Sequence, residues 1–137
     1  MSVTYSTAAG NARLTQCLNA TGTAAGVSVN GQTAGAGLLV IGTSGLSGAT
    51  GVLCTVILTS TPPFSISAKV ATLSGVPLAA TPSANGTAAL AELRDSASNT
   101  VASGLTVGTS GTDIIVTTTT FSTLVPVSVT SGTITTL

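Results

Sequence analysis

The chain has 137 residues, the size of one domain, and it carries only three basic and three acidic side chains. It has no histidine and two cysteines, so it lacks both the usual base for a serine or cysteine nucleophile and the four ligands of a structural zinc site. Three dispersed cations are too few for the phosphate contacts of a nucleic-acid-binding protein. We therefore expect no enzymatic activity, no cofactor and no nucleic-acid partner.

The mean hydropathy of +0.65 raises the question of a membrane protein. The longest apolar run, Val52–Leu58, is much shorter than the about 20 residues of a membrane-spanning helix. The first six residues show neither the basic nor the apolar region of a signal peptide. We therefore expect no membrane partner, and we favour reduced Cys17 and Cys54 over a disulfide between them.

The first 26 residues differ in composition from the rest and predict an N-terminal arm. Residues 8–19 are rich in alanine and leucine, and Ser6 or Thr7 can cap a helix that starts there. Glycines at positions 22 and 26 are expected to end it. The pattern predicts one short helix within an arm over residues 1–26.

From residue 27 onward, short apolar or β-branched segments alternate with turns rich in glycine, serine and asparagine, which is typical of β-sheets. We expect strand segments, some of which join into one strand, at residues 38–41, 52–59, 64–68 (which 70–73 extends or follows), 76–80, 87–95 (where a helix is the alternative), 100–102, 105–107, 113–118, 125–129 and 133–137. The glycine-rich residues 43–51 predict a loop. The sequence thus predicts an all-β fold over residues 27–137, an antiparallel β-sandwich or barrel-like domain of about nine short strands.

Half of all the charge lies in Glu92, Arg94 and Asp95. Because positions two apart on a strand share a face, we expect an ion pair between Glu92 and Arg94 at a solvated strand end, with Asp95 starting a turn. Asp113 is expected to cap the turn before it through an Asx-type hydrogen bond. A pair of carboxylates for acid–base work, or a calcium site that gathers Glu92, Asp95 and Asp113, stays open as an alternative.

An ordered string of motifs in the second half resembles a family of small structural proteins of tailed bacteriophages. The string comprises Pro63-Phe64, Ala71-Thr72-Leu73, Asn85-Gly86-Thr87-Ala88-Ala89, Leu93-Arg94-Asp95-Ser96 and Gly104–Ile114. Its most specific part runs from Arg94 to Ile114, and residues 8–18 are similar to the family's short N-terminal helix. The acidic residue expected before the Pro-Phe element is absent here.

The resemblance implies a capsid cement, or decoration, protein. Such a protein assembles in the host cytoplasm, binds the outside of the virion as a homotrimer and stabilises the lattice by bridging subunits of the major capsid protein. A tail or fibre adhesion component is the alternative, and a carbohydrate hydrolase built on Glu92 with Asp95 or Asp113 is a third hypothesis. The expected contact elements are the N-terminal segment Ser2–Leu18 and the corner at residues 62–64, although the simpler interpretation of Phe64 is a core residue. The candidate interface residues are Tyr5, Arg13, Leu14, Leu18, Pro62, Pro63 and Phe64.

Overall fold

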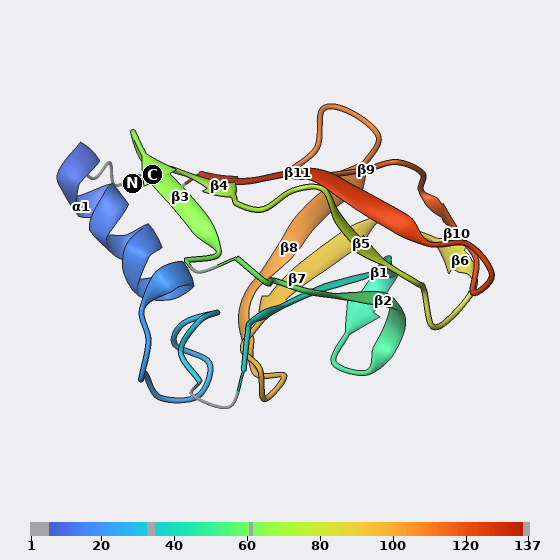
Figure 1. The fold of residues 1–137 in the computed structure, drawn as a ribbon, viewed down its shortest axis with the longest axis horizontal. Helices are drawn as coiled ribbons and strands as arrows, with labels where there is room; N and C mark the ends of the chain where they lie inside the picture. Colours follow the sequence, from blue (N-terminus) through green and yellow to red (C-terminus); the bar gives the residue numbers. More distant parts are fainter. Residues whose placement is uncertain (1–5, 33–34, 61, 136–137) are drawn as a thin grey trace.

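The computed structural model describes residues 6–32, 35–60 and 62–135 (Figure 1). The chain starts with a helix, α1 (Thr7–Leu14), which continues into a π-helical turn, η1 (Thr15–Asn19). The Ser6 hydroxyl accepts a hydrogen bond from the backbone N–H of Ala9 at 3.1 Å, which satisfies one of the free donors of the first turn. The predicted short helix is therefore confirmed. No described helix is long and apolar enough to cross a membrane.

The rest of the described chain is β-structure and its connections, as predicted. The strands are β1 (Leu38–Ser47), β2 (Thr50–Ile57), β3 (Phe64–Ser67), β4 (Val70–Leu73), β5 (Leu78–Ala80), β6 (Gly86–Thr87), β7 (Leu90–Arg94), β8 (Thr100–Gly108), β9 (Ile114–Val116), β10 (Thr120–Phe121) and β11 (Val127–Thr135). Nine of them form one sheet in the order β2-β1-β7-β8-β9-β11-β4-β3, with β5 also paired to β11, and β10 pairs separately with β6.

The sheet curls back on itself toward a barrel. In Figure 1, β11, β9 and β4 run across one layer, and β7, β8, β1 and β2 lie across from them. Strand β5 pairs with β11, and just after it the backbone N–H of Ser83 donates to the carbonyl of Leu53 in β2 at 2.7 Å. This contact links the two distant sides of the sheet, so the all-β, barrel-like prediction is confirmed.

One pair of strands departs from the predicted antiparallel arrangement, so the sheet is mixed. Strands β8 and β9 are parallel over two residue pairs, Val107 with Ile114 and Gly108 with Ile115. The short connection between them is held at its base by Asp113, whose Oδ2 accepts from the backbone N–H and the hydroxyl of Thr106 at 3.0 and 3.2 Å. Asp113 therefore joins two strands, and the Asx-type cap expected for it is not the bond observed.

The loop predicted at residues 43–51 was wrong, because β1 and β2 continue through it as one long hairpin. The glycines of this hairpin let the backbones of β1 and β2 come close together, since a Cβ on Gly42 would collide with the carbonyl oxygen of Gly51. At the tip, Gly48 has a φ of +57°, which suits a tight turn. Glycine-rich composition here marks a twisted hairpin with an irregular register and not an open loop.

Two pairs of predicted short strands are single long strands. Residues 100–102 and 105–107 both belong to β8, and residues 125–129 and 133–135 belong largely to β11. Strand β11 is long because it changes partners along its length, pairing first with β5 and β9 and then with β4. The register shift between Val129 and Ser131 accompanies that change.

The hydrophobic core fills the space inside the curled sheet. Its largest fully buried side chains are Phe64, Phe121, Leu18, Leu39, Ile41, Leu93, Ile114, Val29, Val40, Val56, Val116 and Val127. Leu14 and Leu18 of the arm belong to the same core as the strands. The arm is therefore packed onto the β-structure through its apolar face.

Candidate interface

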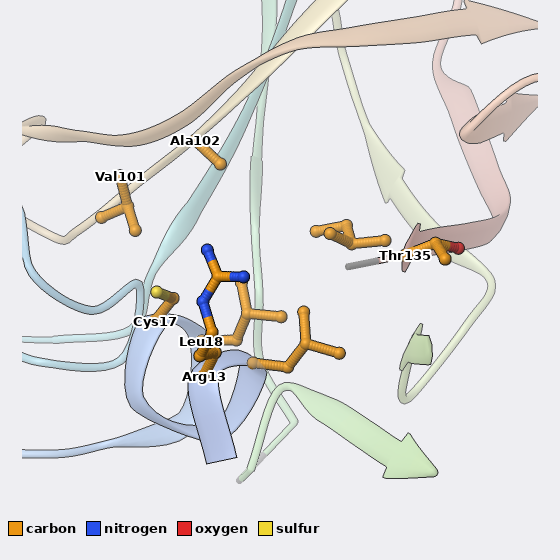
Figure 2. A pocket seen from close by; sticks show the side chains of 8 residues that line it. Arg13, Cys17, Leu18, Val101, Ala102 and Thr135 are labelled. Carbon is orange, nitrogen blue, oxygen red and sulfur yellow. The ribbon is translucent and has the colours of Figure 1, made fainter. Parts of the chain in front are cut away.

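An open pocket of about 180 Å³ lies between the arm and the ends of two strands (Figure 2). It is lined from the arm by Arg13, Leu14, Cys17 and Leu18, and from β8 and β11 by Val101, Ala102, Ile134 and Thr135. Figure 2 shows the Arg13 side chain extending from the helix toward Val101 and Ala102, with Cys17 beside it. The lining is mostly apolar, with one guanidinium group and one thiol.

The pocket exists because the arm is fixed against the hairpin of β3 and β4. The side-chain oxygen of Asn11 accepts from the backbone N–H of Lys69 at 2.8 Å, in a turn where Lys69 has a φ of +64°. A Cβ on Gly10 would collide with Cγ of Lys69, so glycine leaves the space for that side chain. A glycine inside a helix costs about 1 kcal/mol relative to alanine, and the close crossing explains why it stands here.

A second contact fixes the end of the arm to the predicted corner. The Asn19 side-chain amide donates to the carbonyl of Phe64 at 2.9 Å and accepts from its backbone N–H at 3.2 Å. Asn19 thus occupies the outer edge of β3 at this residue, as a neighbouring strand would. The aromatic ring of Phe64 is 2% exposed and belongs to the core, in agreement with the alternative interpretation of this residue.

The predicted interface residues divide into surface and core. Three of them, Arg13, Leu14 and Leu18, come together on the pocket, and Pro62 is exposed at the corner. Leu14 and Leu18, like Pro63 and Phe64, are buried within the single chain, so little of their surface is left for a partner to cover. Tyr5 lies outside the described residues.

Cys17 lies within the predicted contact segment Ser2–Leu18, but the sequence did not single it out as an interface residue. It stands four residues after Arg13, a spacing that places both on one helical face, and this was the available signal. Both cysteines are free, as expected: Cys17 is exposed and Cys54 is buried. Burial raises the pKa of the Cys54 thiol above its ordinary value, because the apolar surroundings disfavour the thiolate.

The ion pair between Glu92 and Arg94 is present, but the expected solvated location was wrong. Nε and Nη2 of Arg94 donate to Oε1 of Glu92 at 3.0 and 2.8 Å, and Nη2 also donates to the carbonyl of Gly48 at 2.7 Å. The two residues are only 8% and 7% exposed. The long β1–β2 hairpin covers them, and its outer part, residues 43–51, is the segment that the sequence predicted as a loop.

Asp95 starts a turn, as predicted, and it is fully buried. Burial opposes ionisation, but its carboxylate accepts from the backbone N–H groups of Gly26, Ala97 and Asn99 and from the Asn99 side chain, and these bonds lower the pKa of Asp95. The carboxylate is therefore committed to holding the loop around Gly26 against the turn. In the part of the chain that the structure describes, no three histidine, cysteine or acidic residues gather as they would at a metal site.

An exposed apolar tip, residues 122–126, was not predicted. Leu124 is 88% and Val125 55% exposed between β10 and β11. The tip is held in shape by the backbone N–H of Thr123 bonded to the Asn85 side chain at 2.9 Å, and by two N–H bonds from Leu124 and Val125 to Ser122. The sequence signal was a Leu-Val pair in front of a proline, Pro126.

The surface of the protein is almost uncharged. With Glu92, Arg94 and Asp95 buried, the charged side chains left at the surface are Arg13, Lys69 and Asp113. Their charges sum to +1, so copies of the chain repel one another weakly.

No protein-family model matches the chain, and no curated protein or solved structure matches it either.

Proposed function

We propose that the chain is a structural protein of a tailed-bacteriophage virion, a cement protein that binds the outside of the capsid and bridges its subunits. The observation that carries the proposal is the almost uncharged surface, because half of the six charged side chains are buried. Such a surface suits closely packed copies in a shell, because copies that carried a large net charge of one sign would repel one another and oppose assembly. The motifs from Arg94 to Ile114 supply the resemblance that favours a phage over other assemblies.

The mechanism is added binding free energy. A protein that binds the assembled lattice and not the free subunits stabilises the lattice by mass action, by about 2.7 kcal/mol per site when its free concentration is a hundred times the dissociation constant. Summed over many sites, this resists the outward pressure of packaged DNA. The fixed arm and the exposed tip at Leu124 are rigid contact elements, so little conformational entropy is lost on binding.

The alternative within the same class is a tail or fibre component that contributes to host adhesion. Low-charge β-chains rich in glycine, serine and threonine also suit fibres. The two proposals differ in copy number, because a capsid lattice offers hundreds of equivalent sites and a tail offers tens or fewer.

The test is a copy count in virions purified from cells that carry the gene. Quantitative gel densitometry against the major capsid protein is expected to give hundreds of copies per particle. A count in the tens would replace the cement proposal with the fibre proposal, and absence from the particles would overturn both. For a high count, particles stripped of the protein should rupture at a lower temperature and recover when it is added back.

A further inference from the structure

The exposed side chain of Leu124 on the apolar tip, residues 122–126, forms a preformed apolar projection, which we call the knob. Leu124 is 88% exposed, yet the backbone around it is fixed by three hydrogen bonds to Ser122 and Asn85. A large apolar side chain held out in a rigid turn keeps its unfavourable contact with water and gains little freedom in return. Such an arrangement is typical of a side chain that a partner covers.

The pocket under the arm has the matching size and chemistry. Its volume of about 180 Å³ is close to the roughly 150 Å³ of an engineered apolar cavity that accepts a benzene-sized guest, so it has room for a leucine side chain. Val101, Ala102 and Ile134 are partly exposed and contribute apolar surface to its lining, and the buried side chains of Leu14 and Leu18 form its floor. Residues 114–137 contain no charged side chain, so the tip brings neither a cation against Arg13 nor a carboxylate into the apolar space.

The tip and the pocket cannot meet within one chain. In Figure 1, α1 and the turn that enters β11 lie at opposite ends of the molecule. A knob and a socket on opposite ends of the same molecule give a heterologous, head-to-tail contact between copies. If the rotation that relates one copy to the next adds up to a full turn, successive copies form a closed ring; otherwise they form an open row.

We propose that Leu124 of one copy occupies the pocket beneath α1 of a second copy. The occupant is a second copy because the same chain supplies both a rigid apolar knob and an apolar socket of its size, with no charge conflict between them. The contact deepens the self-association part of the proposed function, and it does not depend on capsid binding. One leucine contact gives a transient complex between two molecules, which a crosslinker can capture, and repetition in an assembly strengthens the contact.

Cys17 provides a direct test, since its exposed thiol lines the pocket and Cys54 is buried. Val125→Cys places a thiol beside Leu124 without removing the knob. Treatment of this variant with a short bis-maleimide is expected to join the introduced thiol of one molecule to Cys17 of the next, giving dimers and higher multimers. The matched control is Ile57→Cys, which has nearly the same exposure, 57% against 55%, and lies in β2 outside both elements.

The expected result is crosslinking at least about tenfold faster for Val125→Cys than for Ile57→Cys, since docking raises the local thiol concentration. The added substitution Cys17→Ser should abolish the product, and Leu124→Ser should slow its formation about tenfold. Equal rates for the two cysteine variants, or a product that survives Cys17→Ser, would overturn the proposal. So would protection of Cys17 in virions that show no crosslink from the introduced thiol, because the pocket would then hold a segment of another protein. If the chain is absent from virions but the purified protein still crosslinks through Cys17, this contact stands and only the proposed capsid function is overturned.

Discussion

The buried ion pair makes a quantitative prediction for Arg94→Met. The substitution keeps most of the apolar stem and removes the guanidinium, whose Nε and Nη2 contact Glu92 and whose Nη2 also binds the carbonyl of Gly48. Glu92 would keep one side-chain bond, from the hydroxyl of Thr100 at 3.3 Å. Its carboxylate would then be buried at 8% exposure without an opposite charge.

The expected loss is about 3–5 kcal/mol in the free energy of unfolding, the range for breaking a buried pair from one side. The double variant Glu92→Leu/Arg94→Met removes both charges. It leaves the Gly48 carbonyl and the Thr100 hydroxyl without those partners, at about 1 kcal/mol each, so its loss should be only about 1–2 kcal/mol. The double variant should therefore be more stable than the single one.

Urea denaturation followed by far-ultraviolet circular dichroism measures all three proteins. Arg13→Met is the matched control, because it removes the same charge from an exposed position and should shift stability by no more than about 1 kcal/mol. A loss below about 1 kcal/mol for Arg94→Met, or a double variant no more stable than the single one, would refute the reasoning.

Three further predictions use the other buried polar contacts and the thiols. Because the pKa of Asp95 is lowered on folding, its contribution is complete above its unfolded pKa and is lost as the pH falls through the folded value. Urea titrations should therefore show Asp95→Asn costing more at pH 7 than at pH 3, and an equal cost would contradict this. A maleimide followed by mass spectrometry should label Cys17 in the native protein and Cys54 only after unfolding; fast native labelling of Cys54 would refute its burial. Asn19→Ala removes two bonds to the backbone of Phe64 and should cost about 1–3 kcal/mol, and a cost within error of zero would show that water replaces the amide.

The local pattern of residues was enough to predict the element types. Alternating apolar residues at 64–68 and the apolar run from Val52 became strands, and the alanine-rich segment after Ser6 became a helix, because these signals depend on periodicity and on caps. The turn at Asp95 was also predictable, since its side chain bonds to backbone groups only two and four residues away.

The candidate site was predicted in part. Arg13, Leu14 and Leu18 do share a pocket, but a helix face alone does not reveal which of its residues the core covers. The tip at Leu124 was missed because an apolar pair before a proline is equally typical of the start of a strand. Its exposure depends on where β10 and β11 place it.

Composition by itself determined that this is a β-rich chain with almost no charge. The strand propensity and the charge of each residue can be read from the sequence without knowing which residues are in contact. Only the tertiary structure decided where that small charge lies. The β1–β2 hairpin covers Glu92 and Arg94, and the loop near Gly26 closes over Asp95, through contacts between residues 46 and 69 positions apart. Such contacts depend on strand order and register, which no local pattern specifies. They convert a sparsely charged sequence into a protein whose surface is nearly neutral.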